Sequence, residues 1–227
     1  MSALAAIDIG TNSVRLLVTD SEGNELERAM RITRLGQGVD VAGELAPEAM
    51  ARTLSVLAEY AATARACGVT QLRAVATSAA RDARNGSQFF DAVQRTLGVR
   101  PELLSGEAEA RWSFFGATLG LSPSDGPFLV IDLGGGSTEF VLGVERPAAA
   151  VSLQMGCVRM TERHLHGDPP TSEQLAACAS DVRARLAQVR AVIDVSQART
   201  VIGLAGTVTA LSALELGLER YDAARTH

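Results

Sequence analysis

The sequence predicts an α/β protein of two domains, each of which contains the same strand–turn–strand unit. One copy reads AIDIGTNSVRLLV at residues 6–18, and the other reads VIDLGGGSTEFVL at residues 130–142. Asp, Gly and Ser occupy identical places in the two copies, and the second copy follows the first by 124 positions. A turn-rich segment at 121–127, LSPSDGP, separates the two halves of the chain. The expected domains are residues 1–124 and 125–227.

The elements of the first domain follow from apolar periodicity and from turn residues. Ser21–Asn24 predicts a hairpin turn between two strands. Pro47 suits the first turn of a helix, whose apolar residues recur at helical spacing until Gly68 ends the run. The segment 77–86 is a loop rich in Thr, Ser and Arg. The expected strands are 3–9, 13–19, 25–34, 72–76 and 101–104, and the later helices are 87–97 and 106–120.

The second domain starts the same order of strands again after the turn-rich segment. Two helical patterns and a further strand then follow. The expected strands are 128–132, 137–144, 149–154 and 199–203, and the expected helices are 157–165, 171–193 and one that starts at 206.

Composition limits the class of protein. With 47% hydrophobic and 21% charged residues, the chain is an ordinary soluble globular protein. Asp8 interrupts the first apolar run, so we expect neither a signal peptide nor a membrane span. Cys67, Cys157 and Cys178 are few and lack CxxC spacing, which favours the cytoplasm. A formal net charge of −5 argues against nucleic acid as a partner.

The repeated turn indicates phosphate binding. Small residues let backbone N–H groups approach an anion, and hydroxyl groups add donors. Two such turns suit a substrate that has more than one phosphate group. The candidate phosphate-binding residues of the two turns are Gly10, Thr11, Asn12 and Ser13, and Gly134, Gly135, Gly136, Ser137 and Thr138.

Six motifs carry a resemblance to a known family. They are residues 6–18, ATSAARD at 76–82, SGEAEAR at 105–111, residues 130–139, MGCVR at 155–159 and GLAGT at 203–207. In this order they resemble the exopolyphosphatase and guanosine pentaphosphate phosphatase (Ppx/GppA) family of the actin-like ATPase superfamily. Within the family, the chain looks most like the short actinobacterial exopolyphosphatase-like proteins. The resemblance implies two actin-like (ribonuclease H-like) domains with a phosphate-binding cleft between them.

The resemblance implies that Asp132 and Glu139, which flank the triple-glycine turn, hold a divalent cation, Mg²⁺. Carboxylate oxygens near a phosphate site are ligands that Mg²⁺ uses. On the residues alone, Asp132 could instead cap the turn, and Glu139 could be a solvated strand residue.

The resemblance also assigns the general base to Glu109. In a helix that starts near Gly106, Glu107 and Arg111 form an i, i+4 pair, and Glu109 lies about 200° around the helix from Glu107. Without the resemblance, Glu109 would read as a surface residue.

Two arginines are candidate anion ligands. Arg81 follows Thr77 and Ser78 and is expected to hold a phosphoryl oxygen by a forked contact. Arg15 occupies the position in the first copy that Glu139 occupies in the second. It is either an anion ligand or an exposed strand residue.

Three further positions belong to the candidate phosphate site. The resemblance places Cys157 close to phosphate, although it could equally be a small core residue. Gly206 and Thr207 open a helix whose N–H groups could hold a phosphate, or they could simply cap it. His164 and His166 lie two residues apart, which is the wrong spacing for a metal site on one helix face.

The resemblance has one gap. Members of the family continue past the position of His227, so we expect the second domain to be incomplete. Either the chain is a fragment, or another chain completes the domain, as in a homodimer. The basic helical module of long-chain enzymes has no counterpart here, which favours short polyphosphates or nucleotides.

Two functions of different classes are therefore considered. The first is a Mg²⁺-dependent hydrolase that releases terminal phosphate from inorganic polyphosphate, with guanosine pentaphosphate as a second substrate. The alternative is a non-catalytic sensor of these ligands or of guanosine tetraphosphate, and Glu109 separates the two because a sensor needs no base. A sugar-kinase-like or acetate-kinase-like enzyme needs an acceptor pocket, for which we find no signal.

Overall fold

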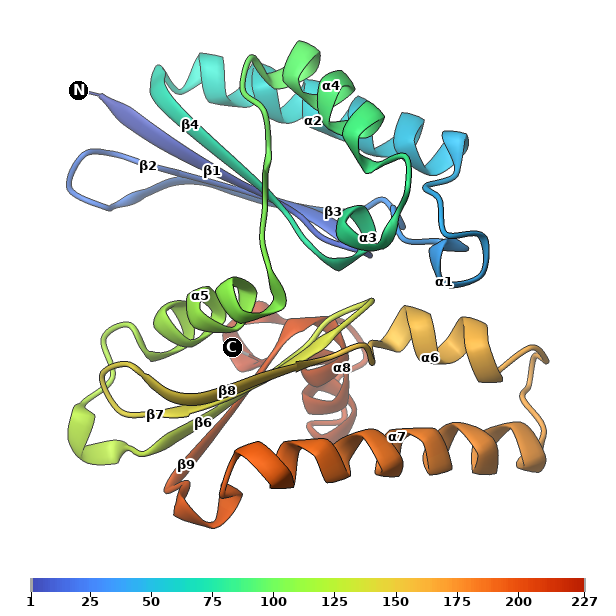
Figure 1. The fold of residues 1–227 in the computed structure, drawn as a ribbon. Helices are drawn as coiled ribbons and strands as arrows, with labels where there is room; N and C mark the ends of the chain where they lie inside the picture. The colour runs from blue at the N-terminus through green and yellow to red at the C-terminus, as the bar shows by residue number, and fades with distance from the viewer. Residues whose placement is uncertain (1, 227) are drawn as a thin grey trace. The chain divides into compact units, whose positions relative to one another are not determined.

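The computed structural model describes residues 2–226, which form two compact units that divide between Ser105 and Gly106 (Figure 1). The first unit contains β1 (Ala3–Ile9), β2 (Ser13–Thr19), β3 (Glu25–Ile32), α1 (Val39–Ala42), α2 (Pro47–Ala66), β4 (Val69–Ala76), α3 (Ser78–Asp82), α4 (Gly86–Leu97) and β5 (Glu102–Leu103). The second contains α5 (Gly106–Thr118), η1 (Pro123–Asp125), β6 (Phe128–Leu133), β7 (Thr138–Gly143), β8 (Pro147–Leu153), α6 (Cys157–His164), α7 (Ser172–Val192), η2 (Val195–Gln197), β9 (Thr200–Leu204), α8 (Ala205–Glu215) and α9 (Ala223–Thr226).

The first unit is a five-stranded sheet in the order β3-β2-β1-β4-β5. The strands β1, β2 and β3 are antiparallel, and β4 pairs with β1 in the parallel direction. Alternate residues of β1 and β2 are buried under α2 and α4, which cover one face of the sheet (Figure 1). This period of two is the pattern of a sheet that is buried on one face, and it explains why the apolar alternation in the sequence predicts these strands correctly.

The second unit repeats the topology with the order β8-β7-β6-β9. Helix α7 packs on one face of this sheet, where Val189 and Ile193 meet Leu129 and Phe140. Helix α5 packs on the other face. Because the third, second, first and fourth strands follow one another in both sheets, the predicted repeat of a strand–turn–strand unit in two α/β domains is confirmed.

The boundary between the units lies at Ser105–Gly106, earlier than the expected boundary at 121–127. Helix α5 packs on β6, β7 and β8 and not on the first sheet. Its Ala110 and Phe114 are fully buried in a core with Phe128 and other residues of the second sheet. Burying a Phe side chain contributes roughly 1.5–3 kcal/mol, so the burial of Phe114 assigns α5 to the second unit. The turn-rich segment only connects α5 to β6.

Most predicted elements begin and end within three residues of the observed ones. The exceptions are the short helices α1, α3 and α9, which were not predicted; α3 lies in the segment expected to be a loop after β4. Four or five residues are too few to produce a helical period in the sequence. Among the described residues, the structure contains no helix with both the length and the apolar character that a membrane span requires.

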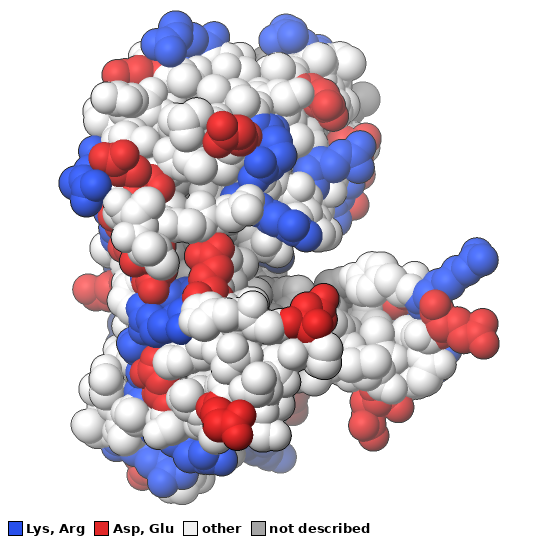
Figure 2. All heavy atoms as spheres, turned by 90° about the vertical axis from the view of Figure 1, so that its right-hand side faces the viewer, with Lys and Arg blue, Asp and Glu red and all other residues white. Residues whose placement is uncertain are grey.

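All 21 basic residues of the Lys and Arg types are Arg. Figure 2 shows one face of the molecule, on which these side chains alternate with Asp and Glu side chains and form no continuous basic stripe. On this face, an anion would therefore meet single arginines and not a continuous basic surface.

Candidate active site

The first glycine turn joins β1 to β2. Its Gly10 N–H donates to the Ser13 carbonyl oxygen at 3.0 Å, which closes the turn. The carbonyl oxygens of Thr11 and Asn12 accept hydrogen bonds of 2.8–3.0 Å from backbone N–H groups of residues 33–36. In a planar trans peptide the N–H group points opposite to the carbonyl, so the N–H groups of these two peptide units point away from residues 33–36.

The hydroxyl group of Thr11 is already engaged within the first unit. Its Oγ1 lies 2.8 Å from Oγ of Ser78, and both side chains are buried. This bond ties the first turn to the start of α3, the short helix that follows β4. Either hydroxyl can be the donor in this bond.

The second glycine turn joins β6 to β7 and is held by α6. Gly134 N–H donates to the Ser137 carbonyl oxygen at 3.1 Å. The carbonyl oxygens of Gly134 and Gly135 accept hydrogen bonds of 2.9–3.1 Å from the first three backbone N–H groups of α6, Cys157–Arg159. Within residues 2–226, the N–H groups of Gly135, Gly136 and Ser137 donate to no protein oxygen. Successive outward N–H groups of this kind form an anion-binding concavity.

A glycine after the third strand holds each turn, and sequence reasoning missed both. A Cβ atom on Gly156 would lie 2.4 Å from the Gly135 carbonyl carbon and oxygen, so only glycine fits. A Cβ atom on Gly36 would lie 2.3 Å from Cγ2 of Thr11. The available signal was the pair of dipeptides Leu35-Gly36 and Met155-Gly156 at equivalent places. The prediction that both turns bind one substrate concerns the arrangement of the two units and stays a prediction.

Asp132 and Glu139 form a carboxylate pair beside the second turn. They are direct partners on the antiparallel strands β6 and β7, so their side chains share one face of the sheet. Oε1 of Glu139, which is 1% exposed, accepts a hydrogen bond from Oγ of Ser152 at 2.7 Å. Oδ2 of the half-buried Asp132 accepts one from Oγ of Ser113 at 2.5 Å. Glu139 is therefore not a solvated strand residue.

Glu109 lies on the face of α5 that meets this carboxylate pair. A Cβ atom on Gly106, at the start of α5, would lie 2.7 Å from Ser152 on β8. Seven residues later, Ser113 bonds Asp132 on β6. Glu109 precedes Ser113 by four residues and shares its helix face. It is half-buried, whereas Glu107 is exposed.

The donor set fits Mg²⁺ and not a metal held by protein alone. Among residues 2–226, no three His, Cys, Asp or Glu side chains come together as a metal site. Mg²⁺ is usually bound by one or two carboxylates together with water and substrate phosphates. Asp132 and Glu139 supply such a pair next to the second glycine turn.

The two predicted arginines lie in the first unit. Arg15 is exposed and is the direct strand partner of Asp8, as Glu139 is of Asp132, so the predicted equivalence of position is confirmed. Arg81 is half-buried on α3, and its Nη1 donates to the Leu104 carbonyl oxygen at 2.7 Å. Their roles toward phosphate stay predictions.

The remaining candidates have different environments. Cys157 begins α6, and its N–H binds the second turn. The buried Thr138 hydroxyl donates to the Met155 carbonyl oxygen, and its backbone lies in β7, paired with β6 and β8, so its role toward phosphate stays a prediction. Gly206 and Thr207 lie in the first turn of α8. The residue before them, Ala205, has a φ of 70°, a strained value for a residue with a side chain.

The sequence profile of the Ppx/GppA phosphatase family matches residues 17–222. The chain is 45% identical to "Exopolyphosphatase 2" of Mycobacterium tuberculosis over 239 aligned positions. The alignment covers 100% of this chain and 75% of that relative.

Two solved structures are similar over nearly the whole chain. The crystal structure of an "exopolyphosphatase-like protein" is 43% identical with a TM-score of 0.94, and the match covers 98% of this chain and 72% of that one. The Aquifex aeolicus member of the Ppx/GppA family is 35% identical with a TM-score of 0.75, with 100% and 73% covered. These matches show that the chain shares the two-domain α/β fold of the solved Ppx/GppA family structures, and they confirm the predicted enzyme class, a phosphoanhydride hydrolase. The chain therefore belongs to the Ppx/GppA phosphatase family.

Proposed function

We propose that this chain hydrolyses the terminal phosphoanhydride bond of inorganic polyphosphate, with short chains preferred and guanosine pentaphosphate as a second substrate. The named activity of the Mycobacterium tuberculosis relative supports this substrate class. The observation that carries the proposal is the placement of Glu109, Asp132 and Glu139 on one side of the second sheet, beside outward N–H groups. The three free cysteines support a reducing cytoplasm as the location.

The residues of the second unit divide the chemistry among them. The N–H groups of Gly135, Gly136 and Ser137 hold oxygen atoms of a phosphate group and stabilise their negative charge. Glu109 accepts a proton from the water that attacks the terminal phosphorus. The P–O bond to the neighbouring phosphate then breaks, which releases inorganic phosphate and a chain shorter by one unit.

Asp132 and Glu139 would hold Mg²⁺, which supplies charge neutralisation at the phosphate oxygens. The hydroxyl groups of Ser113 and Ser152 each occupy one oxygen of these carboxylates and fix its direction. A carboxylate that is oriented in this way needs no rearrangement when it takes up a cation.

The decisive experiment is phosphate release by wild type, Glu109→Gln and the matched control Glu107→Gln. Substrates are tripolyphosphate, long-chain polyphosphate and guanosine pentaphosphate, each with Mg²⁺ and with EDTA. Glu109→Gln should lower turnover by about 10²- to 10⁴-fold, because the amide cannot accept a proton, and should leave binding nearly intact. Glu107→Gln should change nothing, because Glu107 is exposed on another face.

A metal titration separates the roles of the carboxylates. Asp132→Asn and Glu139→Gln should each raise the Mg²⁺ concentration required for half-maximal activity, whereas the exposed Glu145→Gln should not. If wild type binds polyphosphate but releases no phosphate, and Glu109→Gln behaves like wild type, the protein is a sensor and not an enzyme.

A further inference from the structure

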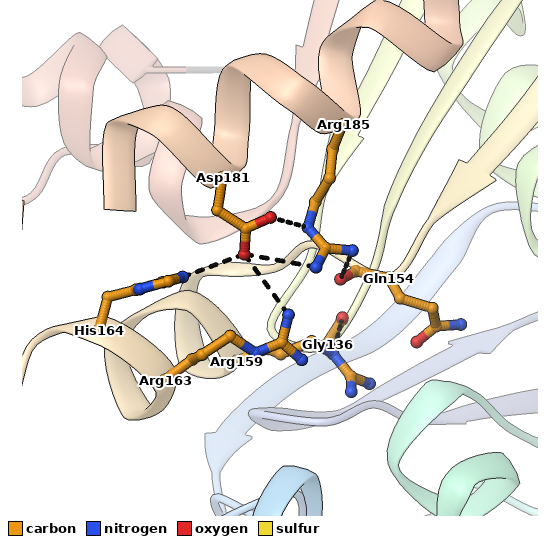
Figure 3. A network of polar contacts seen from close by, with 7 residues as sticks. All are labelled: Gly136, Gln154, Arg159, Arg163, His164, Asp181 and Arg185. Atoms are coloured by element: carbon orange, nitrogen blue, oxygen red, sulfur yellow. Dashed lines mark hydrogen bonds and ion pairs between the residues drawn. The ribbon is translucent and has the colours of Figure 1, made fainter. Parts of the chain in front are cut away.

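An ion-pair network in the second unit leads from α7 to the second glycine turn (Figure 3). Its centre is the Asp181 carboxylate on α7. Oδ2 of Asp181 lies 3.0 Å from Nε2 of His164 and 3.5 Å from Nη1 of Arg163, both on the last turn of α6. Oδ1 accepts a hydrogen bond from Nε of Arg185 at 2.7 Å. One carboxylate therefore fixes the carboxyl end of α6 against α7.

The same network reaches the segment that enters α6. Nη2 of Arg185 donates to Oδ2 of Asp181 at 3.3 Å, and its Nη1 donates to the Gln154 carbonyl oxygen at 3.2 Å (Figure 3). Gln154 lies two residues before Gly156, the glycine that packs on the turn. Asp181 orients the Arg185 guanidinium by two contacts, so Arg185 carries this influence to the amino end of α6.

Helix α6 in turn determines the direction of the carbonyl and N–H groups of the second glycine turn. Its first three N–H groups bind the carbonyl oxygens of Gly134 and Gly135, and Nε of Arg159 donates to the Gly136 carbonyl oxygen at 2.7 Å (Figure 3). All three glycine carbonyls are thus directed toward α6. Because the peptide units are planar and trans, the N–H groups of Gly135, Gly136 and Ser137 are directed away from α6.

We propose that Asp181 is a positioning residue for phosphate binding: through Arg185 and α6 it holds the second glycine turn with three N–H groups directed outward. The inference rests on the proposed function, because it assigns a purpose to the phosphate site. The carboxylate is only 22% exposed, and its hydrogen bonds to His164 and Arg185 lower the pKa of Asp181 to about 2. The Asp181 carboxylate is therefore charged throughout the physiological range.

Asp181→Asn removes the charge without a change of size. The matched control is Asp194→Asn, because Asp194 is exposed and its carboxylate bonds Ser196 and Gln197, two and three residues further along the chain. The first measurement is hydrogen exchange at the amides of Cys157, Val158 and Arg159, which donate to the turn. We expect faster exchange in Asp181→Asn and unchanged exchange in the control.

The second measurement is calorimetric binding of tripolyphosphate with Mg²⁺ in a Glu109→Gln background, so that turnover does not interfere. Addition of Asp181→Asn should weaken binding by roughly ten- to a hundredfold, as expected when a site is misplaced by a distant change. Addition of Asp194→Asn should leave binding unchanged. Asp181→Glu, which keeps the carboxylate, should recover most of the affinity. Arg185→Lys, which keeps the charge and loses the fork, should also weaken binding.

Unchanged exchange in Asp181→Asn would overturn the inference, because α6 would then not depend on the carboxylate. Faster exchange with unchanged binding would also overturn it, because the turn would not need α6 to bind phosphate. The parent Glu109→Gln variant distinguishes these results from failure of the proposed function. If that parent, like wild type, binds no tripolyphosphate, the proposed phosphate site itself is wrong.

Discussion

Asp132 and Glu139 stand directly opposite each other on neighbouring antiparallel strands, and each carboxylate accepts a hydrogen bond from a different serine. Two like charges in such a position repel one another. The serine hydroxyls, together with a bound cation in the proposed function, offset that repulsion. The pair is therefore arranged to receive positive charge, and each serine becomes a point at which the arrangement can be tested.

Removal of either serine hydroxyl should weaken cation binding. Ser113→Ala and Ser152→Ala each leave a carboxylate without its orienting donor, and outer-shell changes of this kind typically cost about 10- to 100-fold in metal affinity. The Mg²⁺ dependence of phosphate release measures the effect. The exposed Ser180→Ala on α7 is the control. Identical Mg²⁺ curves for all four proteins, wild type included, would show that the serines do not orient the carboxylates.

Gly156→Ala should disturb the second turn without touching a charged group. The added Cβ atom would lie 2.4 Å from backbone atoms of Gly135, which cannot move aside as a side chain can. Overpacking costs about 1–3 kcal/mol, so we expect a lower free energy of unfolding and weaker phosphate binding. Gly116→Ala is the control, because a Cβ atom there meets nothing within 4 Å on the exposed side of α5. That change should stabilise the helix by about 0.5–1 kcal/mol. A Gly156→Ala protein as stable as wild type would contradict the close packing.

Arg81→Lys tests the predicted role of the arginine on α3. Lysine keeps the positive charge, but it loses the planar fork and places its charge at a single point. We expect a higher KM and a lower kcat for tripolyphosphate. The control is Arg84→Lys, which changes an exposed arginine just after α3 and should behave like wild type. Equal kinetics of the Arg81 and Arg84 variants would remove Arg81 from the phosphate site.

Asp181 should contribute to stability in a way that depends on pH. Its pKa falls from 3.8 to about 2 because His164 and Arg185 donate to the charged carboxylate. A depressed pKa in the folded state stabilises the protein above the unfolded pKa, and that contribution is lost as pH falls toward about 2. Denaturant unfolding of wild type and Asp181→Asn should therefore differ above pH 4 and converge at lower pH. If the two proteins differ in their free energy of unfolding by the same amount above and below pH 4, the lowered pKa of Asp181 is not the cause of the difference.

Sequence reasoning predicted the two glycine turns and the strands around them because their determinants are local. Alternating burial in β1 and β2 and small residues between them need no knowledge of distant packing. The sequence could not show which side of α5 packs against the sheet, and so it could not place Glu109. A helical period shows that Glu107 and Glu109 face different ways, but not which face meets a sheet. Ser113 and Asp132 are 19 residues apart in the sequence, so the hydrogen bond between them forms only when α5 packs on β6.

Two other features could not be predicted for related reasons. Ala110 and Phe114 mark an apolar face on α5, yet the pattern does not say which of two sheets will cover it, so the domain boundary was placed too late. The network around Asp181 joins two helices and the segment before one of them. Isolated charged residues on a helix usually face solvent, so their sequence carries no sign of such a contact.

The glycine that follows the third strand has a consequence for protein engineering. Each glycine turn is shaped by a residue 22 to 26 positions downstream, as Gly134 with Gly156 and Gly10 with Gly36 illustrate. Transfer of the short turn alone into another scaffold would leave its carbonyl groups without donors and free to rotate. The portable module is therefore the complete three-stranded meander with the start of the helix behind it, and any designed phosphate site of this type should be built at that size.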